Sequence, residues 1–149
     1  MPEPSFMDVA FAEARAAGAA AEVPIGCAIV RRGEVIARAG NHTLRDRDPT
    51  AHAEMLAIRA AASALGSERL VDCDLYVTLE PCAMCAAAIS FARIRRLYFG
   101  AGDAKGGAVE HGVQFFAAPT CHHRPQVYGG IGEQEAARLL RDFFADKRS

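Results

Sequence analysis

The chain has 149 residues, 51% of them hydrophobic, enough for one globular domain whose core needs no disulfide or metal to fold. Its formal net charge of −1 excludes a strongly basic nucleic-acid binder whose affinity comes mainly from phosphate neutralisation. No apolar run approaches the ~20 residues of a membrane span, and the first residues do not read as a signal peptide. Five cysteines, an odd number, favour a reducing cytoplasm.

Hydrophobic periodicity in the first half of the chain predicts a helix, a hairpin and a second helix. The hairpin turns at Arg32-Gly33, and Gly66 closes the second helix as a C-cap. In chain order the expected segments are a helix over Phe6–Ala20 capped by Ser5, strands over Ile25–Arg31 and Glu34–Ala39, a polar loop over Asn41–Thr50 and a helix over Ala51–Leu65. The expected apolar stripe of the first helix consists of Val9, Ala10, Ala12 and Ala16.

The second half of the chain alternates strands with helices. Pro81 suits the first turn of a helix, because its missing N–H would have no intrahelical partner there. The expected segments are strands over Asp74–Leu79, Arg95–Phe99 and Gln126–Tyr128, helices over Pro81–Phe91, Val113–Ala117 and Glu133–Phe144, and a glycine-rich loop over Gly100–Val109. This order predicts an α/β fold, a three-layer α/β/α sandwich with a mixed sheet of roughly five strands, forming one domain over residues 1–149.

The stretch TLEPCAMCAAA places the thiols of Cys82 and Cys85 three positions apart at an expected helix start. The pair is compatible with a redox centre, a structural zinc site or a catalytic zinc site. A closed structural zinc could recruit Cys121, His122 or His123 as a fourth ligand. The partial positive charge at a helix N-terminus favours the thiolates that a metal requires.

A second motif, PTAHAEML, places His52 and Glu54 at the expected first turn of the second helix. The resulting order, H-x-E followed by P-C-x-x-C, is the signature of zinc nucleobase deaminases. With Cys82 and Cys85, the neutral imidazole of His52 would leave a fourth position of a zinc ion open, as in catalytic sites. Glu54 need not bind the metal and can carry a proton from water to the substrate. These residues predict one Zn²⁺ held by His52, Cys82 and Cys85, with Glu54 as the catalytic residue.

The sequence resembles the cytidine-deaminase-like superfamily and, within it, the bacterial TadA-type tRNA-specific adenosine deaminases. The similarity runs through EVPIG, DPTAHAE, LYVTLEPCAMC, RIRRLYFGAGDAKGGA and LLRDFF. The zinc motif specifies only the reaction type, whereas GDAKGGA and the Phe143-Phe144 pair resemble the tRNA branch. The resemblance implies a homodimer that hydrolytically deaminates adenosine to inosine at the wobble position of a tRNA anticodon and releases ammonia. No membrane or DNA partner is expected.

By matched motif, the resemblance implies substrate contacts from Asn41, Ala53, Asp103 and Phe144. Asn41 would hydrogen-bond the edge of the bound base, and its amide can donate and accept at once. Asp103 falls in the loop that contacts flanking nucleotides, and Phe144 in the segment that closes the nucleotide pocket. An anticodon loop presents unstacked bases, so extruding one costs less than from a duplex. His111 lies outside these motifs and is expected to be exposed.

Two departures from the family pattern concern RNA binding rather than the zinc site. Gly102 replaces the arginine of the segment that often reads GARDAK, and ADKRS follows Phe144 in place of a longer basic tail. Both predict weaker RNA contacts, which a local basic face around Arg93, Arg95 and Arg96 would supplement.

Two other functions are compatible with the zinc motif: deamination of a free base or nucleoside of the guanine or cytosine type, and a non-catalytic zinc-stabilised RNA-binding module.

Overall fold

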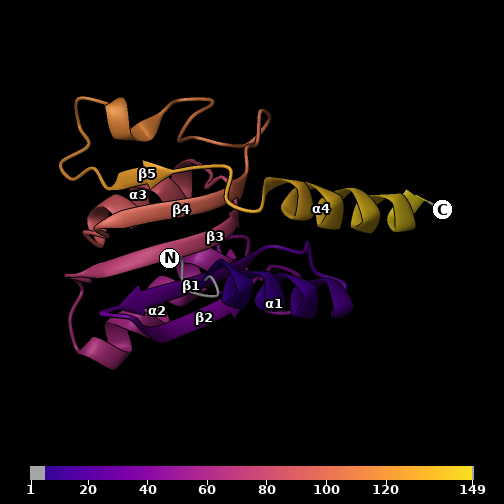
Figure 1. Cartoon of the computed structure of the whole chain (residues 1–149), viewed down its shortest axis with the longest axis horizontal. Helices are drawn as coiled ribbons and strands as arrows, with labels where there is room; N and C mark the ends of the chain where they lie inside the picture. The colour runs from indigo at the N-terminus through magenta and orange to yellow at the C-terminus, as the bar shows by residue number, and fades with distance from the viewer. Residues whose placement is uncertain (1–5, 149) are drawn as a thin grey trace.

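A five-stranded sheet lies between two pairs of helices in the computed structural model, which describes residues 6–148 (Figure 1). In chain order the elements are α1 (Phe6–Ala19), β1 (Gly26–Arg31), β2 (Glu34–Gly40), α2 (Ala53–Leu65), β3 (Cys73–Leu79), α3 (Ala83–Phe91), β4 (Arg96–Ala101), the short 3-10 helix η1 (Phe115–Ala117), β5 (Gln126–Tyr128) and α4 (Glu133–Arg148). The strand order is β2-β1-β3-β4-β5. β1 pairs antiparallel with β2 and β3, whereas β3, β4 and β5 are parallel. The predicted mixed α/β fold is confirmed.

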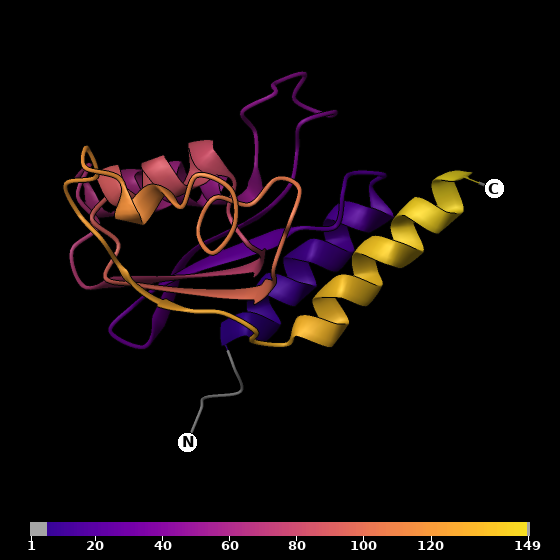
Figure 2. The ribbon, with the colours of Figure 1, turned by 90° about the horizontal axis from the view of Figure 1, so that it is seen from above.

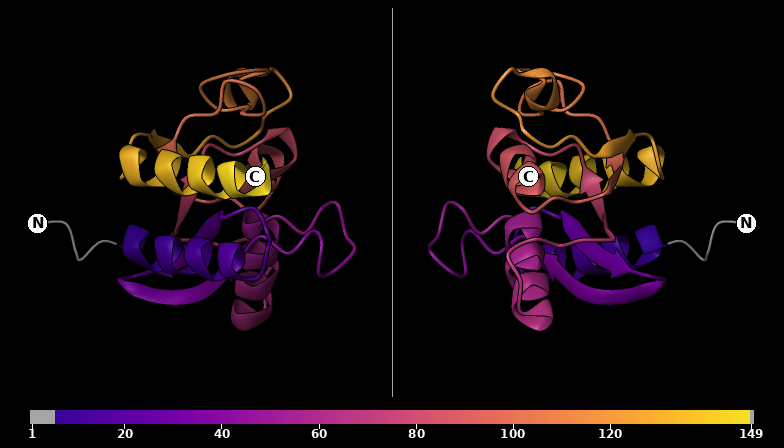
Figure 3. Two further views of the ribbon diagram at one scale, coloured as in Figure 1. Left: turned by 90° about the vertical axis from the view of Figure 1, so that its right-hand side faces the viewer. Right: turned by 90° about the vertical axis from the view of Figure 1, so that its left-hand side faces the viewer.

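The helices cover both faces of the sheet and give three layers (Figures 2 and 3). α1 and α4 run side by side on one face, and α2 and α3 pack on the other. Burying a large apolar side chain stabilises the fold by about 1.5–3 kcal/mol. The larger core, between the sheet and α2 and α3, includes the fully buried Ile29, Leu75, Val77, Ile89 and Leu97. Every helix within residues 6–148 is too short or too polar to cross a bilayer.

The parallel strands β3 and β4 bring two functional segments to one edge of the sheet. β3 ends at Leu79, three residues before Cys82, and β4 ends at Ala101, two residues before Asp103. Parallel strands have their carboxyl ends at the same edge, which is where open α/β sheets bind ligands. The segments that follow β3 and β4 therefore meet there.

Pro81 lies just before α3 rather than in its first turn, contrary to the prediction. Cys82 is the N-cap residue, with an extended ψ of 178°, and its carbonyl accepts the first helical hydrogen bond from the N–H of Ala86 at 2.8 Å. The carbonyl of Pro81 instead accepts a hydrogen bond from Ala108, in the loop after β4, at 2.9 Å. This tertiary contact holds Pro81 outside the helix.

The buried face of α1 also differs from the predicted stripe, of which Ala12 and Ala16 are exposed. In an alanine-rich helix the faces differ little in hydrophobicity, so the few large side chains determine which face is buried. The buried residues are Met7, Ala10, Phe11, Ala14 and Ala17. The predicted cap, Ser5, lies outside the described residues. α4 continues to Arg148, beyond the predicted end at Phe144.

Candidate metal centre and active site

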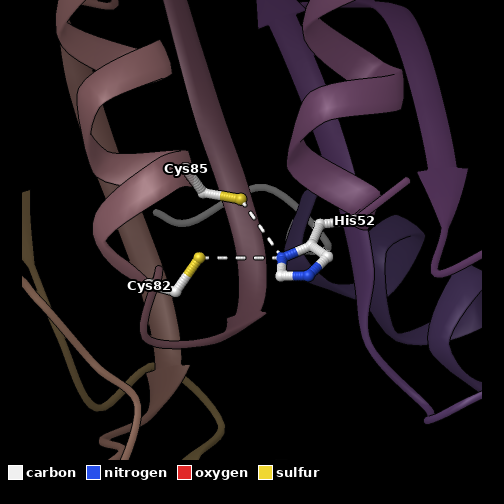
Figure 4. Close-up of side chains that lie close together, drawn as sticks. All are labelled: His52, Cys82 and Cys85. Atoms are coloured by element: carbon white, nitrogen blue, oxygen red, sulfur yellow. Dashed lines mark hydrogen bonds between the residues drawn. The ribbon is translucent and has the colours of Figure 1, made fainter. Parts of the chain in front are cut away.

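Three side chains with metal-binding atoms meet at the N-termini of α2 and α3 (Figure 4). His52 is the N-cap of α2, Cys82 is the N-cap of α3, and Cys85 lies one turn further into α3. Nδ1 of His52 is 3.6 Å from Sγ of Cys82 and 3.5 Å from Sγ of Cys85. All the donor atoms lie within 4.8 Å of one another. Among residues 6–148 this is the only group of three or more potential metal ligands.

The three donor atoms fit a single tetrahedral zinc ion. With Zn–S bonds of about 2.3 Å and Zn–N bonds of about 2.1 Å, tetrahedral angles place sulfur and nitrogen about 3.6 Å apart. The observed separations of 3.6 and 3.5 Å match this value. A Cys₂His donor set is one that catalytic zinc sites use, with the fourth position left for water or substrate. The expected cofactor, one Zn²⁺ per chain, is therefore confirmed by the residues present.

The thiols are arranged to attract a cation. The hydrogen bond from Cys85 lowers the pKa of Cys82 to about 4, against the opposing effect of burial. The same interaction raises the pKa of Cys85, which keeps the proton. The pKa of His52 is raised because its ring hydrogen-bonds to Cys82. A thiolate at a helix N-terminus is thus present near neutral pH as the first ligand for a metal.

Glu54 lies beside the three ligands without being one of them. It belongs to the first turn of α2, is 4% exposed, and lines the same cavity as His52 and Cys82. Burial raises the pKa of Glu54 to about 7. A carboxyl group that titrates near neutrality can both accept and donate a proton. Its position suits the expected role in proton transfer.

Two adjoining cavities open at the carboxyl ends of β3 and β4. The cavity at the metal centre has a volume of about 260 Å³ and is lined by Ile25, His52, Glu54, Leu79, Glu80, Cys82, Asp103 and Gly106. Its volume is at the small end of the ~300–1,000 Å³ typical of ligand pockets and suits one planar ring system. A second cavity of about 360 Å³, lined mostly by apolar residues, shares Leu79 and Asp103 with it and has Phe144 on its wall.

The structure brings two of the four predicted substrate residues, Asp103 and Phe144, to these cavities. Asn41 and Ala53 are buried nearby, at the end of β2 and the start of α2, and line neither cavity. Asn41 is only 6% exposed, and its backbone N–H donates to the carbonyl of Ile25 while its own carbonyl accepts from Arg45, both at 3.1 Å.

Sequence reasoning missed two buried carboxylates that hold the loops around the site. Glu22 is fully buried and accepts hydrogen bonds from the backbone N–H groups of Leu44 and Arg45, at 3.1 and 2.8 Å, which fixes the loop after β2. Glu80 is paired with His111, whose Nδ1 lies 2.7 Å from Oε1 of Glu80. His111 is therefore half-buried and not simply exposed as expected. The only sequence signal was a glutamate one or two positions before a proline, in EPC and EVP.

Two predicted alternatives lie elsewhere in the fold. The thiol of Cys121 donates to the carbonyl of His123 at 3.1 Å, and Nε2 of His123 lies 2.7 Å from the carbonyl of Ile94, so neither side chain reaches the metal centre. Arg95 makes two 3.0 Å hydrogen bonds to Asp74 just before β4, at the opposite end of that strand from the site. The basic face is thus partly neutralised and remote from the cavities.

Residues 2–101 match the family model described as the cytidine and deoxycytidylate deaminase zinc-binding region. The match covers both H-x-E and P-C-x-x-C, which contribute the three ligands and Glu54. The mixed sheet and its metal centre thus define a zinc-dependent deaminase, a hydrolase acting on C–N bonds.

More similar relatives identify the branch. Over 143 residues the chain is 64% identical to the tRNA-specific adenosine deaminase of Agrobacterium fabrum, covering 96% of this chain and 94% of that one. It is 42% identical to the tRNA-specific adenosine deaminase of Bacillus subtilis, over 96% of this chain and 89% of that one. The chain belongs to the tRNA-specific adenosine deaminase family.

Solved structures agree with this placement. A structure from a study of A-to-I editing by tRNA:A34 deaminases at the wobble position of transfer RNA superposes with a TM-score of 0.89 and 64% identity, covering 91% of this chain and 98% of that one. The guanine deaminase of Nitrosomonas europaea superposes with a TM-score of 0.79 and 26% identity, covering 97% and 86%. A tRNA-editing deaminase and a guanine deaminase thus share this architecture.

Proposed function

We propose that this chain deaminates adenosine to inosine at the wobble position of a tRNA anticodon. Water replaces the exocyclic amine of the base, and ammonia is released. The observation that carries the proposal is the 64% identity, over nearly the whole chain, to a tRNA-specific adenosine deaminase. The cavity that contains the metal ligands and Glu54 supplies the chemistry that this reaction needs.

In this mechanism, His52, Cys82 and Cys85 hold the zinc ion and Glu54 moves the protons. When bound, zinc supplies Lewis-acid activation of water at neutral pH. Glu54 takes the first proton of the attacking water and passes it to a ring nitrogen of the base, then takes the second proton from the hydroxyl now on the reacting carbon and passes it to the departing amine. Because burial raises its pKa to about 7, Glu54 can both accept and donate a proton near neutral pH.

Four residues are proposed to hold the nucleotides. The side-chain amide of Asn41 hydrogen-bonds the edge of the target base, and Ala53 contacts that base at the start of α2. Asp103 lies between the two cavities and contacts a flanking nucleotide, while Phe144 closes the apolar cavity beside it. An apolar wall next to the reaction cavity suits a second unstacked base.

We further propose that the protein acts in the cytoplasm as a homodimer and that residues 1–149 form one deaminase domain. All five cysteines are free thiols in the structure, which suits a reducing compartment. Phe91 on α3 is 69% exposed, and a second subunit would remove such an apolar surface from water. Light scattering of the purified chain at several concentrations measures the oligomeric state; a monomer at every concentration would contradict the dimer.

Deamination of free guanine is the second candidate, because the fold superposes on a guanine deaminase. The test is ammonia release by the zinc-loaded protein from an anticodon stem-loop RNA, compared with free guanine, cytosine and adenosine at equal concentrations. We expect turnover of the stem-loop and inosine at the wobble position. Turnover of a free base with none on the RNA would assign the chain to the second function.

A further inference from the structure

Glu80 joins the metal centre to the loop after β4, over residues 102–112, and has no role in the reaction proposed above. It follows β3, is two residues from Cys82, and its side chain is completely buried at the edge of the reaction cavity. A buried carboxylate is stable only when hydrogen bonds replace the water that it has lost. The groups that donate these bonds therefore identify the segment that Glu80 holds in place.

Five N–H groups, all from the loop over residues 102–112, donate to the two oxygens of Glu80. Oε1 accepts from the backbone N–H of Asp103 at 2.8 Å and from the ring of His111 at 2.7 Å. Oε2 accepts from the backbone N–H groups of Val109, Glu110 and His111, at 3.0, 2.8 and 3.0 Å. One side chain thus ties both ends of the loop to the same point.

Neighbouring contacts make this attachment tight. The carbonyl of Pro81 accepts a hydrogen bond from the N–H of Ala108 at 2.9 Å. Gly107 packs directly on the carboxylate, because a Cβ added there would lie 2.5 Å from Cδ of Glu80. The loop backbone therefore rests on Glu80 and Pro81, immediately before the ligand Cys82.

We infer that Glu80 is a positioning residue, which sets the loop over residues 102–112 relative to the zinc-binding start of α3 and thereby determines affinity for the RNA substrate. The loop contributes Asp103 and Gly106 to the reaction cavity, and Asp103 also lines the adjoining cavity. If the loop shifts, the groups that face the nucleotides shift while the zinc ligands stay. The effect on affinity rests on the proposed RNA substrate, whereas the attachment of the loop does not.

The test compares Glu80→Gln with the matched control Glu110→Gln. Both remove one negative charge within the same loop network, but the side chain of Glu110 is exposed and only its backbone contacts Glu80. An amide keeps only one acceptor oxygen, so in either orientation at least one loop N–H loses its partner. We expect KM for the anticodon stem-loop to rise by about tenfold in Glu80→Gln, the effect of one or two lost hydrogen bonds, and little change in Glu110→Gln.

Three readouts separate positioning from general damage. Zinc content should stay at one per chain, and kcat should fall less than KM rises, because substrate binding rather than chemistry is impaired. Hydrogen exchange at the amides of Asp103 and residues 109–111 should be at least about tenfold faster than in Glu110→Gln. This exchange result depends on no substrate, so it is informative even if the stem-loop is not turned over.

Unchanged KM and unchanged amide protection in Glu80→Gln would overturn the inference, as would equal effects of the two variants. If Glu80→Gln does not fold, His111→Gln replaces it, because it alters one of the five donors and leaves the backbone donors. A roughly threefold higher KM for His111→Gln, with zinc and melting temperature kept, is then expected from a weakened hydrogen bond. An unchanged KM in that variant would overturn the inference.

Discussion

Glu54 and Glu80 are both buried carboxyl groups on the wall of one cavity, and their pKa values differ widely. Burial raises the pKa of Glu54 to about 7. Burial also acts to raise the pKa of Glu80, but hydrogen bonds from Asp103, His111 and Val109 outweigh it and lower the pKa to about 2. The difference comes from the donors around each group, since both side chains are removed from water.

The contrast shows how one site contains both a mobile proton and a fixed charge. A carboxyl group with few donors exchanges its proton near neutral pH, which general acid–base catalysis requires. A carboxylate saturated by N–H groups keeps its charge and orders the backbone that supplies them. Glu54, at the start of α2, is thus suited to proton transfer, whereas Glu80, just after β3, is suited to holding the loop backbone in place.

Cys82 lines the same cavity as the two carboxyl groups, and replacing it removes a candidate zinc ligand. We expect Cys82→Ser to lose bound zinc and all measurable deamination, because a serine hydroxyl is not deprotonated to bind the metal near neutral pH. Zinc is measured by atomic absorption on protein dialysed against metal-free buffer. One equivalent of zinc kept at wild-type affinity would mean that Cys82 is not a ligand.

Replacing Glu54 removes only the proton carrier. We expect Glu54→Ala to lower kcat by ~10²–10⁴-fold, the usual contribution of general acid–base catalysis, and to retain zinc and fold. Single-turnover deamination of a stem-loop RNA, with circular dichroism and zinc content as controls, measures this effect. Wild-type turnover in Glu54→Ala would exclude this residue from the mechanism.

If the unmodified, zinc-loaded chain binds the RNA without deaminating it, the protein is a non-catalytic binding module.

The two carboxyl groups contribute to the pH dependence of stability with opposite signs. The lowered folded-state pKa of Glu80 stabilises the protein above about pH 4.5, and this contribution of about 3 kcal/mol is lost as the pH falls toward about 2. The raised folded-state pKa of Glu54 contributes stability that is complete below about pH 4.5 and is lost as the pH rises through about 7.

Denaturant unfolding of the metal-free protein at pH 3, 4.5 and 7.5 tests both signs in one experiment. We expect Glu80→Gln to reduce the loss on acidification and Glu54→Gln to reduce the loss on going from pH 4.5 to 7.5. Wild-type pH dependence in both variants would mean that other groups control stability in these ranges.

Asn41 differs from the two glutamates because its side chain is an uncharged amide. The backbone of Asn41 bonds to Ile25 and Arg45, and we expect its side-chain amide to bond to a ligand. Asn41→Ala should raise KM for the stem-loop by roughly 3- to 10-fold, the effect of one or two lost hydrogen bonds. Melting temperature and zinc content are the controls; an unchanged KM would remove Asn41 from substrate recognition.

The cluster of potential zinc ligands was predictable because each of its residues lies in a short motif whose spacing acts locally. His52 and Glu54 are two residues apart at one helix start, and Cys82 and Cys85 are one turn apart at another, so few conformations are compatible with each pair. The general order of strands and helices was predictable for the same reason, since hydrophobic periodicity is local.

Other features could not be predicted, because they depend on segments far apart in the chain. The partners of Glu80 lie 23 to 31 positions further on, and nothing in EPC indicates which amides will reach it. Pro81 lies outside α3 because of its contact with Ala108, and the buried face of α1 depends on how the sheet packs against it.

The sequence by itself determined the reaction class: two local motifs contain the three zinc ligands and Glu54 at spacings that a helix start places together. Only the tertiary structure decided the electrostatic state of the carboxyl groups at the site. Burial and hydrogen-bond donors set a pKa: folding buries Glu54, and the donors to Glu80 lie 23 to 31 residues further along the chain, where only the folded sheet brings them to it.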